Sequence, residues 1–247
     1  MDRVGSQVGL LGFRRGLECG ANTPLDLDRE LEAEIYTGNT KRRRAPRFEL
    51  VAGAVCLDFV NTLDDRFTPD PKELLKHYVD LARFAEDTGT LNDQQVDRLM
   101  TRGMQYPDDA ERALASATRL REAISDIFYA LAGNKPVPTA ALAVLNQQVQ
   151  QAAQHLVLVA GKQSFEWKFE TDGYDLFAPL WPIARDAAQL LASERVEFVR
   201  ACASKTCEWI FLDESKNHRR RWCDMTKCGN RAKVKRFYVR QKRSARS

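Results

Sequence analysis

Four cysteines near the end of the sequence are the residues whose type and spacing could do chemistry. They follow the pattern Cys202-x4-Cys207-x15-Cys223-x4-Cys228. Two thiol pairs separated by such a loop can converge on one tetrahedral ion, and Zn²⁺ suits four thiolates because it is borderline soft and imposes no d-electron geometry. Four protein ligands leave no position for water or substrate. The sequence therefore predicts one structural Zn²⁺ and no catalytic metal.

Other uses of these thiols remain open at this point. A redox disulfide pair, buried free thiols and an iron–sulfur cluster are the alternatives to zinc. The first twenty residues hold only a short apolar piece interrupted by Arg14 and Arg15, which argues against a secretory signal. In a chain without one, clustered paired cysteines more often hold a metal. His218 in the intervening loop either faces solvent or replaces a cysteine ligand.

The second chemical signal is positive charge around and after the cysteines. Residues 202–247 carry 14 Lys and Arg against four acids, a formal charge of +10, whereas the preceding 201 residues carry −6. This polarity indicates an acidic body with an end that binds polyanions. Nucleic acid is the predicted partner, DNA favoured over RNA. The predicted nucleic-acid-binding residues are Arg219, Arg220, Arg221, Arg231, Lys233, Lys235, Arg236 and Arg240.

Residues 230–242 contain neither Gly nor Pro and are expected to form one basic helix. Val234, Phe237 or Tyr238, and Gln241 recur at helical spacing, so one face is predicted to pack on the zinc module. The alternative is that this helix docks a protein or aids solubility. The aromatic side chains that either stack on bases or pack around the metal are Trp209, Trp222 and Tyr238.

A polar group in the body has two interpretations. Arg121 stands on a predicted apolar helix face, where a buried arginine needs a partner, and Asp58 and Asn61 are the candidates. The group is either a structural ion pair or a pocket for a small polar ligand that shifts the zinc module. The predicted pocket residues are Asp58, Asn61, Arg66 and Arg121. No nucleophile–base arrangement or phosphate loop accompanies them, so no enzyme activity is expected.

Apolar periodicity predicts the elements that position these residues. Helices are expected over residues 72–88, from Asn92, over 108–131, from Thr139, and over 176–192. The apolar run 51–63 fits either a strand or a helix. Residues 156–159 and the alternating 165–169 predict a β-hairpin with one buried face, and 196–200 predict a short strand.

The predicted fold class is α+β, mainly helical: a larger helical body with a small β-hairpin, followed by a small zinc module that ends in a basic helix. The expected domains are a disordered extension over 1–45, the body over 46–198 and the module over 199–247. No stretch of 18 apolar residues occurs, so no membrane span and a cytoplasmic location are expected. No heptad run is visible, and a homodimer remains open.

These residues also resemble a known family. Residues 228–231 read CGNR, preceded by FLD at 211–213 and RWC at 221–223, which resembles the CGNR zinc finger. The body resembles the ABATE domain that accompanies it, through CLDFVNT at 56–62, LREA at 120–123 and LWPIA at 180–184. The resemblance covers about residues 48–242.

This resemblance implies a stress-induced transcription regulator of bacteria that binds DNA, with RNA binding proposed for similar zinc-ribbon-like proteins. The four cysteines match the finger's zinc ligands. Gly229 is expected to supply a tight turn into the last helix and Asn230 to cap it. Arg231 is expected to pair with Asp213 or with a phosphate.

Overall fold

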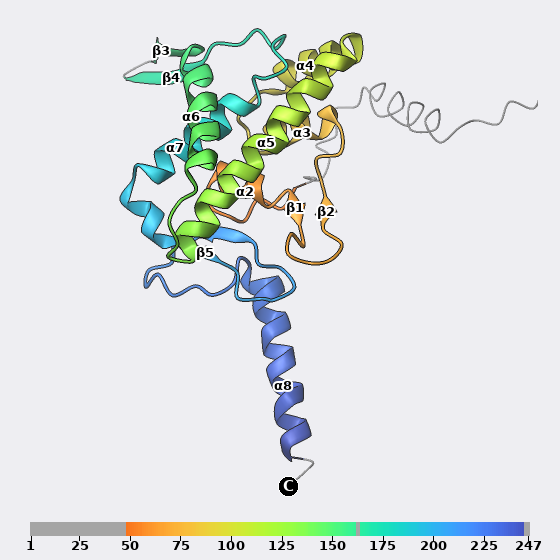
Figure 1. The fold of residues 1–247 in the computed structure, drawn as a ribbon, viewed down its shortest axis with the longest axis vertical. Coiled ribbons are helices and arrows are strands. Elements are labelled where there is room, and N and C mark those ends of the chain that lie inside the picture. The colour runs from red at the N-terminus through yellow and green to blue at the C-terminus, as the bar shows by residue number, and fades with distance from the viewer. Residues whose placement is uncertain (1–47, 162–163, 245–247) are drawn as a thin grey trace, which may run out of the picture. The chain divides into compact units, whose positions relative to one another are not determined.

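The computed structural model describes residues 48–161 and 164–244, which lie within the compact unit Arg44–Ser247 (Figure 1). The extension predicted over residues 1–45 lies outside the described residues. In chain order the elements are α2 (Val55–Val60), β1 (Leu63–Asp64), β2 (Lys72–Glu73), α3 (Tyr78–Asp87), α4 (Asp93–Gln105), α5 (Pro107–Ala132), α6 (Thr139–Ala153), β3 (Leu156–Ala160), β4 (Phe165–Phe169), α7 (Leu180–Leu191), the 3₁₀ turn η1 (Glu194–Phe198), β5 (Val199–Ala201), β6 (Ile210–Leu212), the π turn η2 (Met225–Gly229) and α8 (Asn230–Ser244).

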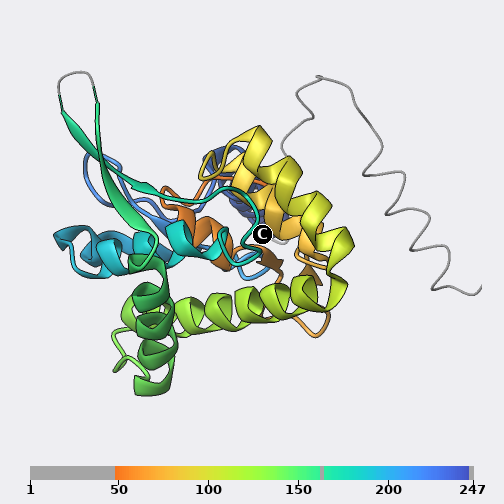
Figure 2. The same ribbon diagram turned by 90° about the horizontal axis from the view of Figure 1, so that it is seen from above.

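The predicted fold class is confirmed, since the described residues form mainly helices and three two-stranded antiparallel ribbons. The long α5 crosses the unit and packs against α2, α3, α4 and α6 (Figures 1 and 2). None of the helices in the described ranges is both long and apolar enough to cross a membrane.

Local signals set the ends of several helices, including the cap predicted at Asn92. The side chain of Asn92 accepts a hydrogen bond from the backbone N–H of Gln95, which caps α4. Pro107 occupies the first turn of α5, where its missing N–H has no helical partner to lose, and Gly133 follows its last residue. The apolar run 51–63, which fitted a strand or a helix, contains the short buried helix α2.

Two predicted helices begin later than their apolar periodicity indicated. The helix predicted over 72–88 begins only at Tyr78. The carboxylate of Asp80 accepts the backbone N–H groups of Lys76 and His77 (2.9 and 3.0 Å) and so caps the N-terminal end of the helix at this point. Its first residues form β2 instead, paired with β1. The helix predicted from 176 begins at Leu180, with Pro182 in its first turn.

The predicted β-hairpin is present as β3 and β4, but the prediction that one face is buried was wrong. Phe165 and Trp167 are 72% and 56% exposed. At the base of the hairpin Phe169 lies against Trp181 of α7, with ring centroids 6.1 Å apart. The hairpin extends beyond the end of α6 (Figure 2). Beyond its base, the guanidinium of Arg185 on α7 lies 5.9 Å from the centre of the Trp167 ring.

The ribbon of β5 and β6 carries the first cysteines into the core of the body. The strand predicted over 196–200 is η1 followed by β5, which pairs with β6. The side chains of Ile210, Phe211 and Leu212 are at most 1% exposed. The backbone N–H of Leu212 donates to the carbonyl of Ala52 (2.7 Å), just before α2. The cysteine-bearing ribbon and the helical body therefore share one hydrophobic core.

This shared core predicts that the body and the metal module unfold together. Phe211→Ala removes a fully buried ring and should lower the free energy of unfolding by about 3–5 kcal/mol. In urea unfolding followed by far-ultraviolet circular dichroism, which reports the helices of the body, one transition should move to lower urea. Phe237→Ala, the same change at a 58% exposed position, should alter stability by less than about 0.5 kcal/mol. An unmoved helical transition in Phe211→Ala would contradict a shared core.

Candidate metal centre and nucleic-acid interface

The four predicted cysteines converge on one point. Their sulfur atoms all lie within 4.8 Å of one another, with 3.5 Å between Cys207 and Cys223 and 3.8 Å between Cys223 and Cys228. A tetrahedral ion with Zn–S bonds of about 2.3 Å separates its sulfur ligands by roughly 3.8 Å. The donor set and spacing therefore fit one structural Zn²⁺, which all four thiolates would hold.

Two backbone turns bring the first pair of ligands together. The backbone N–H of Cys202 donates to the carbonyl of Trp209 (2.8 Å), and that of Cys207 donates to Ser204 (3.0 Å), so the chain folds back between β5 and β6. The N–H of Ala203 donates to the carbonyl of Arg221 (2.8 Å), which ties the loop carrying the second pair to this turn.

The second pair is positioned by η2. The carboxylate of Asp224 accepts the backbone N–H groups of Thr226 (2.5 Å) and Lys227 (3.1 Å), so Asp224 caps the turn that carries Cys228. A Cβ added to Gly229 would lie 3.2 Å from the end of the exposed Met225 side chain, which would have to shift slightly to make room.

The expected roles of Gly229 and Asn230 were both wrong. Gly229 does not belong to the glycines with positive φ. Asn230 has helical backbone angles, and its side-chain amide donates to the carbonyl of Thr226 (2.8 Å) one turn earlier. The helix runs on from η2, so the cap lies at Asp224. Asp is one of the preferred N-cap residues, so this cap was a signal present in the sequence.

Hydrogen bonds to sulfur divide the ligands unequally. The thiols of Cys207 and Cys223 hydrogen-bond to the sulfur of Cys202, which lowers the pKa of Cys202 well below its ordinary value and raises the pKa of Cys207 and of Cys223. Arg231 donates from Nη2 to the sulfur of Cys228 (3.1 Å), and this contact raises the pKa of Arg231. A positive charge next to the four thiolates offsets part of the net negative charge of a zinc–tetrathiolate centre.

The expected pairing of Arg231 with Asp213 is absent because Asp213 is fully buried and bound elsewhere. Its carboxylate accepts from the backbone and hydroxyl of Ser215 (3.0 and 2.6 Å) and from the backbone N–H of Arg220 (2.7 Å). His218 is not a metal ligand. Its Nδ1 lies 2.7 Å from the carbonyl oxygen of Asp213, and its ring stacks on Phe198 at 3.7 Å.

Two tryptophans pack beside the metal module. Trp209 donates its Nε1–H to the carboxylate of Asp64 in β1 (2.7 Å), which joins the cysteine loop to the β1–β2 ribbon. Trp222 is half-buried, with the guanidinium groups of Arg221 and Arg236 over its ring at 5.4 and 6.0 Å. Both therefore serve the packing of the module.

The structure places the predicted basic residues in two groups. Arg220 is engaged in the fold: it donates to the carbonyls of Trp222 (2.8 Å) and Cys223 and lies over the ring of Phe211. The others are exposed on the cysteine loop or on α8, and these are Arg219, Arg221, Arg231, Lys233, Lys235, Arg236 and Arg240. Because α8 contains no acid, all of its charged side chains are positive. They surround an apolar strip formed by Val234, Phe237 and Tyr238.

That strip does not pack on the metal module, and the prediction that it would was wrong. Val234, Phe237 and Tyr238 are 54%, 58% and 59% exposed. Figure 1 shows α8 projecting away from the module. Its first turn adjoins η2, and Arg236 in the next turn lies over the ring of Trp222. At 3.6 residues per turn, bases flank the strip on both sides.

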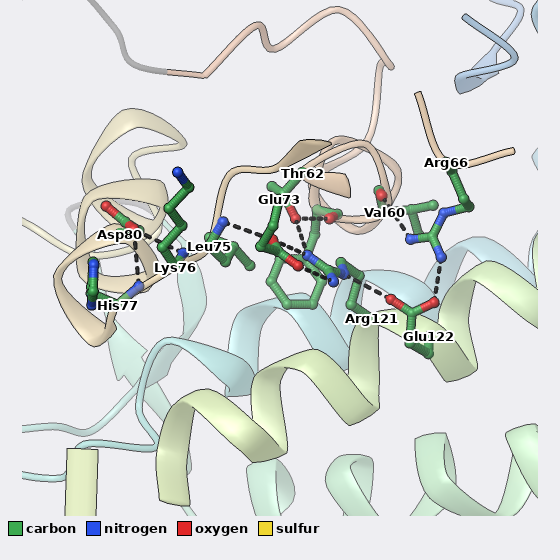
Figure 3. Close-up of polar contacts among 11 residues, drawn as sticks. Val60, Thr62, Arg66, Glu73, Leu75, Lys76, His77, Asp80, Arg121 and Glu122 are labelled. Carbon is green, nitrogen blue, oxygen red and sulfur yellow. Dashed lines mark hydrogen bonds and ion pairs between the residues drawn. The ribbon is translucent and has the colours of Figure 1, made fainter. Parts of the chain in front are cut away.

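Figure 3 shows the surroundings of Arg121, whose partners are carboxylates that the sequence analysis did not select. Its guanidinium is 2% exposed and forms two bonds to Glu73 (2.6 and 2.7 Å) and one to Glu122 (3.0 Å). Burial alone would raise the pKa of Glu73, but the hydrogen bonds and charge of Arg121 together with backbone N–H groups of Leu75 and Leu74 outweigh it and lower that pKa. Arg66 also pairs with Glu122 and donates to the carbonyl of Val60.

Asp58 and Asn61, the two predicted partners of Arg121, form hydrogen bonds with other residues. The carboxylate of Asp58 accepts the backbone N–H of Ala52 (2.9 Å), and burial raises its pKa to about 6. The side-chain amide of Asn61 bonds to both the N–H and the carbonyl of Ile210 (3.1 and 2.9 Å). Asn61 thus takes the place of a neighbouring strand beside β6.

None of the four residues predicted to form a ligand pocket lines the cavity beside the metal ligands. That cavity has a volume of about 190 Å³ and lies between the β1–β2 ribbon and η2. Its lining includes the metal ligands Cys207, Cys223 and Cys228, so it adjoins the metal site, together with Asp65, Trp209, Lys227 and Arg231.

Comparison with protein families gives two matches. The family described as "Putative stress-induced transcription regulator", ABATE, matches residues 53–194, and the CGNR zinc finger matches residues 199–241. A search of curated proteins gives no match. The two families follow each other in the predicted order, and the second begins where β5 begins.

The metal site predicts one zinc per chain in protein purified under reducing conditions. Cys223→Ser should lose the metal, and chelation should lower the melting temperature of the body as well, by about 10 °C or more, because metal binding and folding share one core. Cys56→Ser is the matched control, since Cys56 is buried in α2 away from the four ligands and should keep one equivalent. Less than half an equivalent in the unsubstituted protein would contradict the site.

The ion pairs of α5 predict that two of its arginines contribute very different amounts to the free energy of unfolding. Arg121→Met leaves Glu73 without its buried partner and should cost about 3 kcal/mol of unfolding free energy. Arg112→Met on the same helix removes an exposed pair with Asp109 and should cost less than about 1 kcal/mol. Equal losses in chemical denaturation would show that the Arg121 network does not stabilise the fold.

Proposed function

The chain belongs to the ABATE family and joins this domain to a CGNR zinc finger, and we propose that it is a DNA-binding transcription regulator. The observation that carries the proposal is α8, a 15-residue helix with exposed bases and no acid. Its first turn follows the metal ligand Cys228, so the zinc site holds the base of the helix while the rest is free to meet a partner.

The arrangement of α8 suits a polyanion. Lys and Arg side chains on an exposed helix gain affinity by releasing counterions from phosphates, and Arg can also donate two hydrogen bonds to guanine. The major groove of DNA is about 12 Å wide and admits a helix. Arg219 and Arg221 on the neighbouring loop are exposed and add phosphate contacts in this proposal. Arg220 is left out because it is bound within the fold.

The metal chemistry supports a binding protein over an enzyme. Four thiolates fill the coordination shell of a tetrahedral Zn²⁺, so no ligand position is left to activate water or a carbonyl group. We therefore assign zinc the role of fixing α8 and the cysteine loop in space.

RNA is the second candidate, because exposed aromatic rings lie among the bases of α8. Phe237 and Tyr238 could stack on unpaired bases, which is the usual mode of sequence-specific RNA recognition. Duplex DNA offers no such stacking without distortion of its base pairs. The two candidates therefore differ in whether these rings contribute to binding.

If the body senses a small ligand, the cavity between the β1–β2 ribbon and η2 is the site that we favour. The four residues first considered are bonded to the backbone or to Glu73 and Glu122, whereas this cavity is bounded by the body through Asp65 and by the zinc finger through Lys227. A ligand there would contact both parts at once.

The proposal predicts that the protein, offered mixed DNA and RNA pools at physiological salt, enriches particular DNA sequences. For a selected site, the double variant Lys235→Ala/Arg240→Ala should lower the slope of log K against log salt by about 2 if each residue neutralises one phosphate. The control Lys76→Ala/Lys135→Ala removes two exposed lysines from the body and should leave affinity within about twofold.

Enrichment of DNA supports the proposal, and enrichment of RNA alone supports the second candidate. In that case Phe237→Ala should weaken binding by at least about tenfold, as expected for a lost stacking contact. If neither pool enriches, or if binding does not depend on salt, nucleic-acid binding by α8 is wrong and the helix is a protein-docking element.

A further inference from the structure

The side of α8 that faces the zinc finger is marked by contacts from its first two turns. Arg231 donates to the sulfur of Cys228 (3.1 Å), and the guanidinium of Arg236 lies 6.0 Å from the centre of the Trp222 ring. Ala232 falls between these two arginines on the helix surface and is half-buried, whereas the other described side chains of α8 are exposed. A duplex must therefore approach α8 from the opposite side.

That opposite side, which we call the outer face, is formed by Val234, Phe237 and Gln241. At 3.6 residues per turn, each lies roughly 130° or more around the helix from the midpoint between Arg231 and Arg236. All three side chains are exposed. The outer face therefore combines apolar surface with one uncharged polar side chain, Gln241.

Bases border the outer face on both sides. Lys233 and Arg240 lie along one side of it, and Lys235 lies on the other side, beyond Tyr238; all three bases are exposed. In a helix that lies in the major groove, side chains on the two flanks are nearest to the phosphates, and side chains on the central face are nearest to the base edges. The charge pattern of α8 thus matches a groove that its outer face enters.

The chemistry of Gln241 suits a base and not a phosphate. Its amide carries no charge, so it releases no counterions from a phosphate backbone. It offers a donor and an acceptor side by side, which match the N7 acceptor and the N6 amino donor of adenine in the major groove. The amide of Asn230 is engaged with the carbonyl of Thr226 (2.8 Å), whereas that of Gln241 bonds to none of the residues that the structure describes.

We propose that Gln241 recognises an adenine in the major groove and so determines part of the sequence specificity of α8. This inference rests on the proposed function, because it needs α8 to bind duplex DNA. The side-chain N–H of Gln241 donates to N7 of the base, and its carbonyl oxygen accepts from the N6 amino group. Val234, two turns earlier on the same face, suits a thymine methyl group. Phe237 is assigned no base, because a ring does not stack within an undistorted duplex.

Position separates Gln241 from other exposed glutamines of the chain. Gln147 and Gln150 are also exposed, on α6. No residue of α6 is basic, so no charged side chain of that helix would hold a phosphate backbone beside them. Gln241 lies among bases at the centre of the outer face.

Selection of bound DNA by variant proteins tests the assignment. The unsubstituted protein should prefer adenine at one position of its site by about tenfold or more. Gln241→Glu should change that preference to cytosine, because a carboxylate accepts from the cytosine amino group and cannot donate to N7 of adenine. Preferences are compared within one variant, so the repulsion that the added charge causes on every sequence cancels. Gln150→Glu is the matched control and should select the same sequence as the unsubstituted protein.

A modified base tests which edge is recognised. Replacing the preferred adenine by 7-deazaadenine removes the N7 acceptor and keeps the base pair, so affinity of the unsubstituted protein should fall by about threefold or more. Gln241→Ala should bind the two duplexes equally, with unchanged circular dichroism and zinc content. Lys235→Ala should keep the preference for adenine and lower the slope of log K against log salt by about 1, as expected of a phosphate contact.

The outcomes separate this inference from the proposed function. DNA that is enriched without a preferred adenine, an unchanged preference in Gln241→Glu, or an equal effect of 7-deazaadenine on the unsubstituted protein and Gln241→Ala overturns the role of Gln241 and leaves DNA binding in place. Enrichment of RNA alone, or of neither pool, overturns this inference together with the proposed function.

Discussion

The burial of β6 is the interaction on which the rest of the structure depends. This three-residue strand is part of the ribbon that carries the first two metal ligands. Its side chains lie in the common core, where β6 contacts α2 and its partner β5 contacts α5. A small module with four cysteines has little apolar surface of its own to bury, so it needs either the metal or a neighbour to fold. In this protein it uses both. Metal binding and packing of the body therefore reinforce each other.

Polar groups of the body secure that strand. Asn61 offers its amide to both backbone groups of Ile210, which would otherwise be buried without partners on that side. Asp58 fixes the N–H of Ala52, and the carbonyl of Ala52 accepts from Leu212. The Arg121 network joins the β1–β2 ribbon to α5, and Asp64 of the same ribbon accepts from Trp209. Each contact leads from the helical body toward the zinc finger, so a change in the body could reach α8 through rigid contacts.

The two exposed apolar surfaces differ in what surrounds them. On α8 the apolar strip is bordered by bases alone, and its partner must supply negative charge. On the hairpin, the exposed Leu158, Phe165 and Trp167 adjoin the uncharged strand β3, and the guanidinium of Arg185 lies over the Trp167 ring.

The sequence by itself determined the features that depend on neighbouring residues. The cap at Asn92, the stop at Gly133, the long helix between Pro107 and Ala132 and the grouping of the four cysteines all follow from local propensity or from ligand chemistry. Only the tertiary structure decided which groups meet across long separations. The carboxylate that pairs with Arg121 lies 48 residues away at Glu73, and the amide of Asn61 meets Ile210, 149 residues away. Periodicity also could not show that Phe165 and Phe237 stay exposed, because a repeating apolar pattern defines a face and says nothing of whether another element arrives to cover it.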